Sequence, residues 1–211
     1  KLNLNNSKTQ DDFSSNTVIC SPQMVYELLK QLVRKAGVSP QHIIFYDVTR
    51  KMSKTIYESC IQDFPGVRFI DASNGEGLTE TFAVDSGNQI VWSKDLTLEV
   101  GGGNPTFIPL FISQADYLIN LASLKGHHLA GITLCAKNHF GSFVSVSPGK
   151  PDLWAPMAAG VHPYVAVKDM NFGGHWNFNK REMGTYNCLV DLMGHKSLGK
   201  NTLLYMVDGL Y

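Results

Sequence analysis

The chain has 211 residues, which is long enough for one domain with a substantial hydrophobic core. Hydrophobic residues make up 44% of the sequence and charged residues 17%, a composition that excludes a disordered chain. Eighteen basic and eighteen acidic residues cancel, so no net field attracts nucleic acid or an anionic membrane. We therefore expect no nucleic-acid partner. No apolar run is long enough to cross a bilayer, so we also expect no membrane span.

Both ends of the sequence are typical of strands. The chain begins with Lys1 rather than Met, in "KLNLN", and finishes on "LLYMVDGLY". We therefore expect residues 1–211 to form a single α/β domain that is a fragment of a longer protein. The lack of a signal peptide then says nothing about export, so the compartment stays open between cytoplasmic and exported.

Residues 21–37 form the clearest predicted helix. Ser21 is a good N-cap, Pro22 suits the first helical position and Gly37 closes the helix. Its apolar residues make one stripe: Val25, Leu28, Leu29, Leu32, Val33 and Ala36. Next, "HIIFYDV" is a short, continuously apolar run, which indicates a buried parallel strand.

Helices and strands continue to alternate after that strand. Residues 52–63 predict a helix that buries Ile56 and Cys60, and "GVRFIDA" predicts the next strand. "SGNQIVW" and "LTLEV" favour an antiparallel pair, and "GGGN" a flexible turn. The pattern predicts an α/β fold: a mainly parallel central sheet flanked by helices, with an antiparallel insertion.

The second half of the chain repeats this pattern around one long irregular segment. "ADYLINLA" predicts a strand, and the uncharged stretch 129–136 predicts a helix that is buried on all sides. Residues 148–181 are rich in Gly, Pro, Asn and aromatic residues, which favours a long loop that is either a lid over a ligand or ordinary packing. The final helix is expected to carry Tyr186, Leu189, Val190 and Met193 on one face, before a last strand.

Lys137 stands at the end of the stretch predicted to be a buried helix, with Ala130 and Thr133 on the same side. A desolvated ammonium group has a lowered pKa and becomes a base, a Schiff-base nucleophile or a covalent tether. The alternative is a lysine that reaches solvent at a helix C-terminus, where cations are stabilised. We weigh the two interpretations about equally.

Polar residues also follow several of the predicted strands. Ligands of open α/β sheets bind outside the carboxyl ends of the strands. One aspartate after a strand is commonly a turn residue, but a group with lysines and histidine indicates a site. We predict Lys137, His127 and Lys125 as catalytic residues. The predicted ligand-binding residues are Asn138, Thr133, Lys1, Asn3, Asp47 and Asp208.

Other patterns give weaker predictions. Asp191 and His195 share a helix face at metal-ligand spacing, although a surface or capping pair is the commoner meaning, so the metal stays unknown. The scattered cysteines form no CxxC pair, which gives no support for zinc or iron–sulfur ligation: Cys20, Cys60, Cys135 and Cys188.

The candidate residues resemble a known family, the domain of unknown function 362 family. The family's central signature, Lys-Thr-His, then Thr, then Lys-Asn-x-Phe-Gly, is matched by Lys125, His127, Thr133, Lys137, Asn138, Phe140 and Gly141. Gly126 stands in place of the usual Thr. The strand "DYLIN", the early "KLNLN" and the late "LLYMVDGLY" also resemble family segments, so the resemblance covers nearly the whole chain.

The resemblance implies no settled activity. Many relatives carry a ferredoxin-like cysteine cluster, which implies redox partners. Because this chain lacks that cluster, we expect no internal iron–sulfur cluster, and the cofactor is otherwise unknown. A short His…Ala-Gly…Lys portion is also distantly similar to lactate racemase, where a lysine tethers a nickel-bearing cofactor.

Three functional hypotheses follow, and whether the chain is an enzyme stays open. The first is an enzyme that binds a small anionic or carbonyl-containing ligand at the carboxyl edge of the sheet and uses Lys and His for acid–base chemistry. The second is a non-catalytic module that binds a ligand or cofactor for a redox partner. In the third, Lys137 and Asn138 only complete a helix terminus through internal contacts. The oligomeric state stays unknown.

Overall fold

The structure is a computed structural model, and it describes residues 1–4, 19–73, 75, 78–94, 105–127, 130–145, 161, 164–165 and 186–209. In the first half lie α1 Pro22–Arg34, the 3-10 turn η1 Pro40–His42, β1 Ile44–Asp47, α2 Lys54–Ile61, β2 Arg68–Asp71, β3 Val84–Gln89, β4 Thr106–Pro109 and α3 Leu110–Ser113. In the second half lie β5 Leu118–Ser123, β6 Lys125–His127, β7 Gly131–Thr133, α4 Cys135–Asn138, η2 His139–Gly141, β8 Val144–Ser145, α6 Cys188–Gly194, η4 Gly199–Asn201 and β9 Thr202–Asp208.

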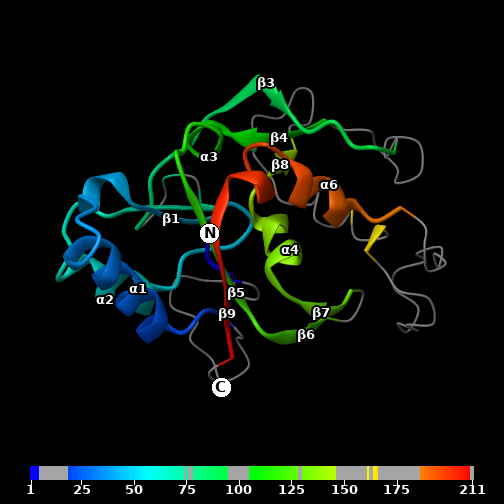
Figure 1. The fold of residues 1–211 in the computed structure, drawn as a ribbon. Helices are drawn as coiled ribbons and strands as arrows, with labels where there is room; N and C mark the ends of the chain where they lie inside the picture. The colour runs from blue at the N-terminus through cyan, green and yellow to red at the C-terminus, as the bar shows by residue number, and fades with distance from the viewer. Residues whose placement is uncertain are drawn as a thin grey trace.

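Two parallel strand pairs, β1–β2 and β5–β9, are joined by the extended residues 1–4 (Figure 1). The backbone nitrogen of Lys1 donates to Ile119 O at 2.8 Å, and Leu121 N donates to Lys1 O at 2.9 Å. On the other side, Leu2 N donates to Tyr46 O at 3.0 Å. These bonds have the parallel pattern, so the strands follow the order β2, β1, residues 1–4, β5, β9.

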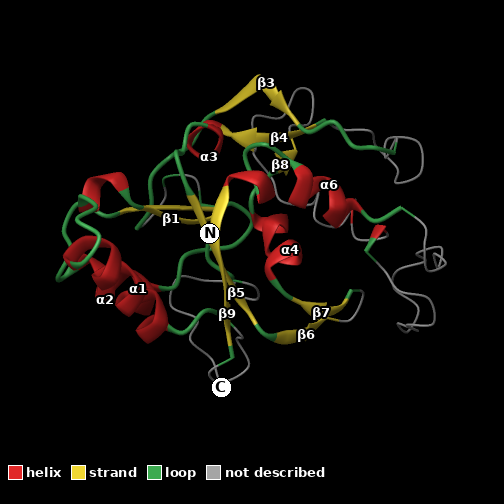
Figure 2. Cartoon of the chain, in the orientation of Figure 1, coloured by secondary structure: helices red, strands yellow, loops and turns green. Residues whose placement is uncertain are grey.

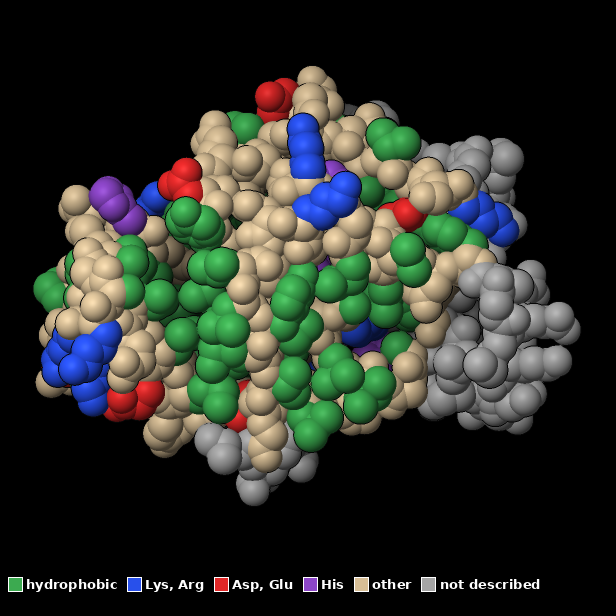
Figure 3. All heavy atoms as spheres, in the orientation of Figure 1, with side chains coloured by type: hydrophobic (Ala, Val, Ile, Leu, Met, Phe, Trp, Pro, Cys, Tyr) green, Lys and Arg blue, Asp and Glu red, His purple; other side chains and the backbone are tan. Residues whose placement is uncertain are grey.

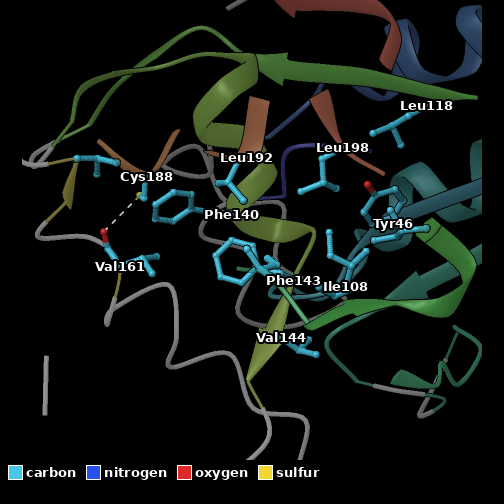
Figure 4. Packing of buried hydrophobic residues seen from close by; sticks show 14 of the residues in the cluster. Tyr46, Ile108, Leu118, Phe140, Phe143, Val144, Val161, Cys188, Leu192 and Leu198 are labelled. Atoms are coloured by element: carbon cyan, nitrogen blue, oxygen red, sulfur yellow. Dashed lines mark hydrogen bonds between the residues drawn. The ribbon is translucent and has the colours of Figure 1, made fainter. Parts of the chain in front are cut away.

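Helices cover this parallel sheet from both sides. Figure 2 shows α1 and α2 on one side of β5 and β9, with α4 and α6 on the other. One apolar cluster joins α1 and α2 to the sheet through Val25, Leu29, Ile56 and Phe69. A second cluster, drawn in Figure 4, joins Tyr46 of β1 to Phe140, Phe143, Leu192 and Leu198.

The α/β prediction is confirmed, including the antiparallel part. The strand order β3–β4–β8 is antiparallel, as is the hairpin of β6 and β7. Helix α1 begins where expected, because Ser21 Oγ accepts from Met24 N at 3.4 Å. Gly37 follows it at a φ of +72°, a left-handed conformation that glycine adopts without strain. "LTLEV", "GGGN" and most of the 148–181 loop lie outside the described residues.

The helix predicted over residues 129–136 is wrong. The described residues there include β7, which pairs with β6 in a hairpin, and α4 begins only at Cys135. Gly131, at a φ of +75°, allows the chain to turn, and the β-branched Ile132 and Thr133 favour the strand that follows. An uncharged apolar run carries no period of its own, which is why the pattern alone did not distinguish strand from helix.

The buried face of α6 also differs from the prediction. Its buried residues are Cys188 and Leu192, whereas Val190 is 70% exposed. The helix has only seven residues and packs against α4 and η4, so its neighbours determine which side is covered. Among the residues that the structure describes, the helices are too short or too polar to span a membrane.

Gly199 lies close to the backbone of α6, and it yields a first prediction. A Cβ at Gly199 would lie closer than 3.0 Å to three backbone atoms of Met193, and backbone atoms cannot move aside as the end of a flexible side chain can. We expect Gly199→Ala to lower the free energy of unfolding by about 1–3 kcal/mol, as overpacking does. Gly194→Ala is the control, because a Cβ added there would meet no atom within 4 Å. Equal denaturation midpoints for the two variants would contradict this packing.

Candidate functional site

A buried ion pair holds together the carboxyl edge of the sheet. Lys1 Nζ lies 3.1 Å from Asp47 Oδ2, and both side chains are at most 5% exposed. Asp47 also accepts from Leu4 N at 3.3 Å and, through Oδ1, from the backbone N and hydroxyl of Thr49 at 3.1 and 2.9 Å. The carboxylate therefore has donors on both oxygens, which is what a buried charge requires.

The Lys1 ammonium group uses its three protons inside the protein. It donates to Asp47, to Asn138 Oδ1 at 3.0 Å and to the carbonyl oxygen of Leu2. Burial lowers its pKa, and the charge of Asp47 opposes that change. Lys1 is thus a structural cation at this edge, and a ligand that it bound directly would have to displace one of these acceptors.

Gly141, the last residue of η2, lies against the ion pair. A Cβ at this position would be 2.6 Å from Lys1 Nζ and closer still to Asp47 Oδ1. Gly141 O also accepts from Val48 N at 3.0 Å, which fixes η2 against the end of β1. The glycine that ends the Lys-Asn-x-Phe-Gly stretch is therefore required by the pair, because no side chain fits there.

A line of directed hydrogen bonds runs from Lys1 into the core. Asn138 Nδ2 donates to Asn120 Oδ1 at 2.8 Å and to Leu121 O at 3.0 Å. Asn120 Nδ2 in turn donates to His139 Nε2 at 3.0 Å, so the His139 proton sits on Nδ1. Burial lowers the pKa of His139 to about 3, which keeps the ring neutral. Asn138 is thus occupied in positioning Lys1.

The hairpin turns one face toward this edge. Lys125 pairs with Thr133, and His127 lies two residues further along β6, so the three side chains share a face. Lys125 Nζ donates to Asn3 Oδ1 at 3.1 Å, and burial lowers its pKa to about 8. His127 Nδ1 accepts from Ala130 N at 3.2 Å, which places the proton of a neutral ring on Nε2.

Thr133 is only 3% exposed, and its hydroxyl has no hydrogen-bond partner among the described residues. The other buried side-chain atom of this kind in the described part of the chain is His139 Nδ1. A buried hydroxyl without a partner is expensive, so its presence beside Lys125 indicates a missing polar neighbour.

Lys137, on α4, is the most unusual cation of the site. It is 8% exposed, and its Nζ lies 3.5 Å from the centroid of the Phe140 ring. The ring face stabilises a protonated amine. Burial acts in the opposite direction and is the largest effect; Cys188 opposes it, and the positive charges of Arg50, Lys125 and Lys1 add to it, so the pKa falls to about 7.

Positive groups at this edge act on one another: Arg50 and Lys1 act on Lys125, and Arg50, Lys125 and Lys1 act on Lys137. The charge of Asp47 acts on Lys1 and Lys125. Figure 3 shows Lys or Arg atoms and His atoms set below a rim of apolar side chains, over the region of α4 and the hairpin. Lysines with lowered pKa values near neutral pH provide both a cation for an anionic ligand and an amine for its chemistry.

Asp208 lies at the same edge but serves a different contact. Its Oδ2 accepts from Ser21 N at 2.5 Å, where a carboxylate stabilises the N-terminus of α1. The structure thus brings together Lys1, Asn3, Asp47, Lys125, Thr133 and Asn138 through the hydrogen bonds and strand pairing above. Asp208 is linked to them through β9, which pairs with β5.

The proposed metal ligands Asp191 and His195 have other partners. Asp191 accepts from Ser93 N and Oγ and from the Tyr186 hydroxyl, and these bonds outweigh burial and lower its pKa. His195 Nδ1 accepts from Ser197 N at 3.1 Å. Within the described part of the chain, no three His, Cys, Asp or Glu residues form a group suited to a metal ion.

Sequence reasoning missed three residues of this region. Arg50 sits in the turn after β1 and adds positive charge to the site. Asn120 and His139 are fully buried and complete the hydrogen-bond line. The signal for Asn120 was its amide in the middle of the apolar strand "LINLA", since a buried amide needs partners.

Gly141 provides the prediction for this site. Gly141→Ala would force apart Lys1 and Asp47, and we expect the free energy of unfolding to fall by about 3–5 kcal/mol, as when a buried pair is broken. Gly126→Ala is the control, because nothing lies within 4 Å of the position its Cβ would take. Chemical denaturation measures both. A Gly141 variant as stable as the control would show that the ion pair is not packed as described.

Comparison with known proteins identifies the family of the chain but no activity. The family described as Domain of unknown function (DUF362) matches residues 1–192, which includes the ion pair, the hairpin and α4. No curated protein and no solved structure matches the chain. The similarity to lactate racemase therefore stays a prediction. Because the match spans most of the sequence, the chain belongs to the DUF362 family, a family of unknown function.

Proposed function

We propose that the chain is an enzyme that binds a small anionic or carbonyl-containing ligand at the carboxyl edge of the parallel sheet. The observation that carries the proposal is a set of cations at this edge: Lys1 is paired with Asp47, Lys125 donates to Asn3, and the charges of Arg50, Lys125 and Lys1 all act on the buried Lys137. Positive charges that are buried close to one another repel and are unfavourable by themselves. An anion among them would remove that repulsion.

The hydrogen-bonding capacity of each group suggests its role. Lys1 and Asn138 are occupied by internal partners, so they position the site. Lys125, which also donates to Asn3, and the Thr133 hydroxyl are assigned the contacts with an oxyanion. Lys137 would then exchange a proton with the bound ligand, because its pKa of about 7 makes either protonation state accessible at neutral pH.

His127 is proposed as a second proton donor. While Nδ1 accepts from the Ala130 backbone, Nε2 carries the proton and is the nitrogen that donates. The hairpin holds the ring on the same face as Lys125. Asp47 orients Lys1 in this proposal. Asp208 would support the site indirectly, through its contact with the start of α1.

Oxalate binding as a function of pH tests the anion site, because oxalate keeps its charge throughout the range. The pKa values of Lys137 and Lys125, about 7 and about 8, are below the ordinary lysine value, so both lysines lose their charge as the pH rises through 7 to 8. We expect oxalate affinity to fall between pH 6 and pH 9 by about tenfold or more, since a charge-assisted hydrogen bond contributes about 1.5–3 kcal/mol. Isothermal titration calorimetry in a chloride-free buffer measures it.

Two variants complete the oxalate experiment. Lys137→Met should remove the part of the pH dependence centred near 7, while Lys200→Met, at an exposed position of η4, should leave the profile unchanged. Oxalate binding that is absent at every pH, or equally strong in Lys137→Met, argues against the site. Binding without turnover of any ligand would favour a non-catalytic module.

A further inference from the structure

The surroundings of Lys137 suit a reacting amine better than a permanent cation. The side chain is 8% exposed, and its Nζ rests on the face of Phe140, a residue of the apolar cluster in Figure 4. The ring attracts an ammonium group, but Arg50, Lys125 and Lys1 repel it, and burial withdraws it from water. With the pKa at about 7, about half of the molecules carry a neutral amine at pH 7.

Donors for a carboxylate lie next to this amine. Helix α4 packs against β7, whose Thr133 has a buried hydroxyl that lacks a partner among the described residues. Lys125 pairs with Thr133 across the hairpin and lies on the same face. The charge of Lys125 also acts on Lys137. A cation and a hydroxyl beside a nucleophilic amine match a ligand whose carboxylate adjoins an electrophilic carbon.

We propose that Lys137 forms an imine with the carbonyl carbon of a 2-oxo acid whose carboxylate is held by Lys125 and Thr133. This inference rests on the proposed function and names the substrate class of the same site. The neutral Nζ attacks the carbonyl carbon and forms a C–N bond. The carbonyl oxygen takes up the two protons of the amine and leaves as water, so the step consumes no oxidant or reductant. Protonation of the imine then places a positive charge next to the bound carboxylate, which stabilises it.

Reductive trapping tests the imine. The protein is incubated at pH 7 with pyruvate and sodium cyanoborohydride, which delivers hydride to the C=N carbon and leaves a stable secondary amine. We expect one adduct per chain, mapped by peptide mass spectrometry to Lys137. An ordinary lysine is neutral in only roughly one molecule in a thousand or fewer at this pH, so surface lysines should be labelled about tenfold or more slowly.

Variants separate this inference from the proposed function. Lys137→Arg keeps a positive charge but forms no imine, so it should lose the pyruvate adduct and still gain thermal stability from oxalate. Lys200→Met, on the exposed surface, should be labelled like the wild type. Acetone, which has a carbonyl group but no carboxylate, should label Lys137 at least about tenfold less than pyruvate, because it lacks the charge-assisted contacts.

The other outcomes overturn either the imine alone or both the imine and the proposed anion site. Labelling that spreads over surface lysines, or that persists in Lys137→Arg, overturns the imine. If pyruvate and oxalate both raise the melting temperature of the wild type while no adduct forms, the imine is wrong and the anion site stands. If neither compound raises the melting temperature and no adduct forms, the proposed function fails as well.

Discussion

The structure depends on the buried ion pair between Lys1 and Asp47. Asp47 ends β1, Lys1 begins the extended residues that lie between β1 and β5, and Asn138 of α4 accepts a hydrogen bond from the same ammonium group. The pair therefore joins three segments that are far apart in the sequence. A buried charge is stable only when partners compensate it, so the stability of the pair depends on all three segments. Gly141 adds a steric condition, since only a residue without a side chain fits against the pair.

The same interaction explains how one edge of the sheet can hold several cations. The carboxylate of Asp47 acts on Lys1 and Lys125 in the direction that keeps them charged. Burial has the largest effect on the pKa of Lys137, whose Nζ lies over the ring of Phe140 and which the other cations repel. The lysine beside Asp47 is thus fully engaged, whereas the pKa of Lys137 lies at about 7. This difference between the two lysines is the physical basis for proposing a ligand with both a carboxylate and a carbonyl group.

The sequence predicted the framework better than the local structure of the site. Caps and periodicity identified α1, and continuous apolar runs identified β1 and β2, because these signals are local. The hairpin was missed, since the uncharged run 129–136 suits a strand or a helix until tertiary packing decides. For Lys137 the sequence left a buried amine and a solvent-exposed one open; the side chain is buried, and its catalytic role stays a prediction. The roles of Arg50 and His139 depend on contacts between distant segments, which one sequence does not reveal.

The central claim is that the Lys1–Asp47 pair holds the strand ends together, and a double-mutant cycle tests it most directly. Asp47→Asn replaces an acceptor of four donors by an amide with one oxygen, so we predict a loss of about 3–5 kcal/mol in the free energy of unfolding. Asp63→Asn, at an exposed pair with Arg34, should cost less than about 1 kcal/mol. Adding Lys1→Met to Asp47→Asn should restore part of the loss, because no uncompensated buried charge remains. Strictly additive losses, or an Asp47 variant as stable as the Asp63 variant, would contradict the account.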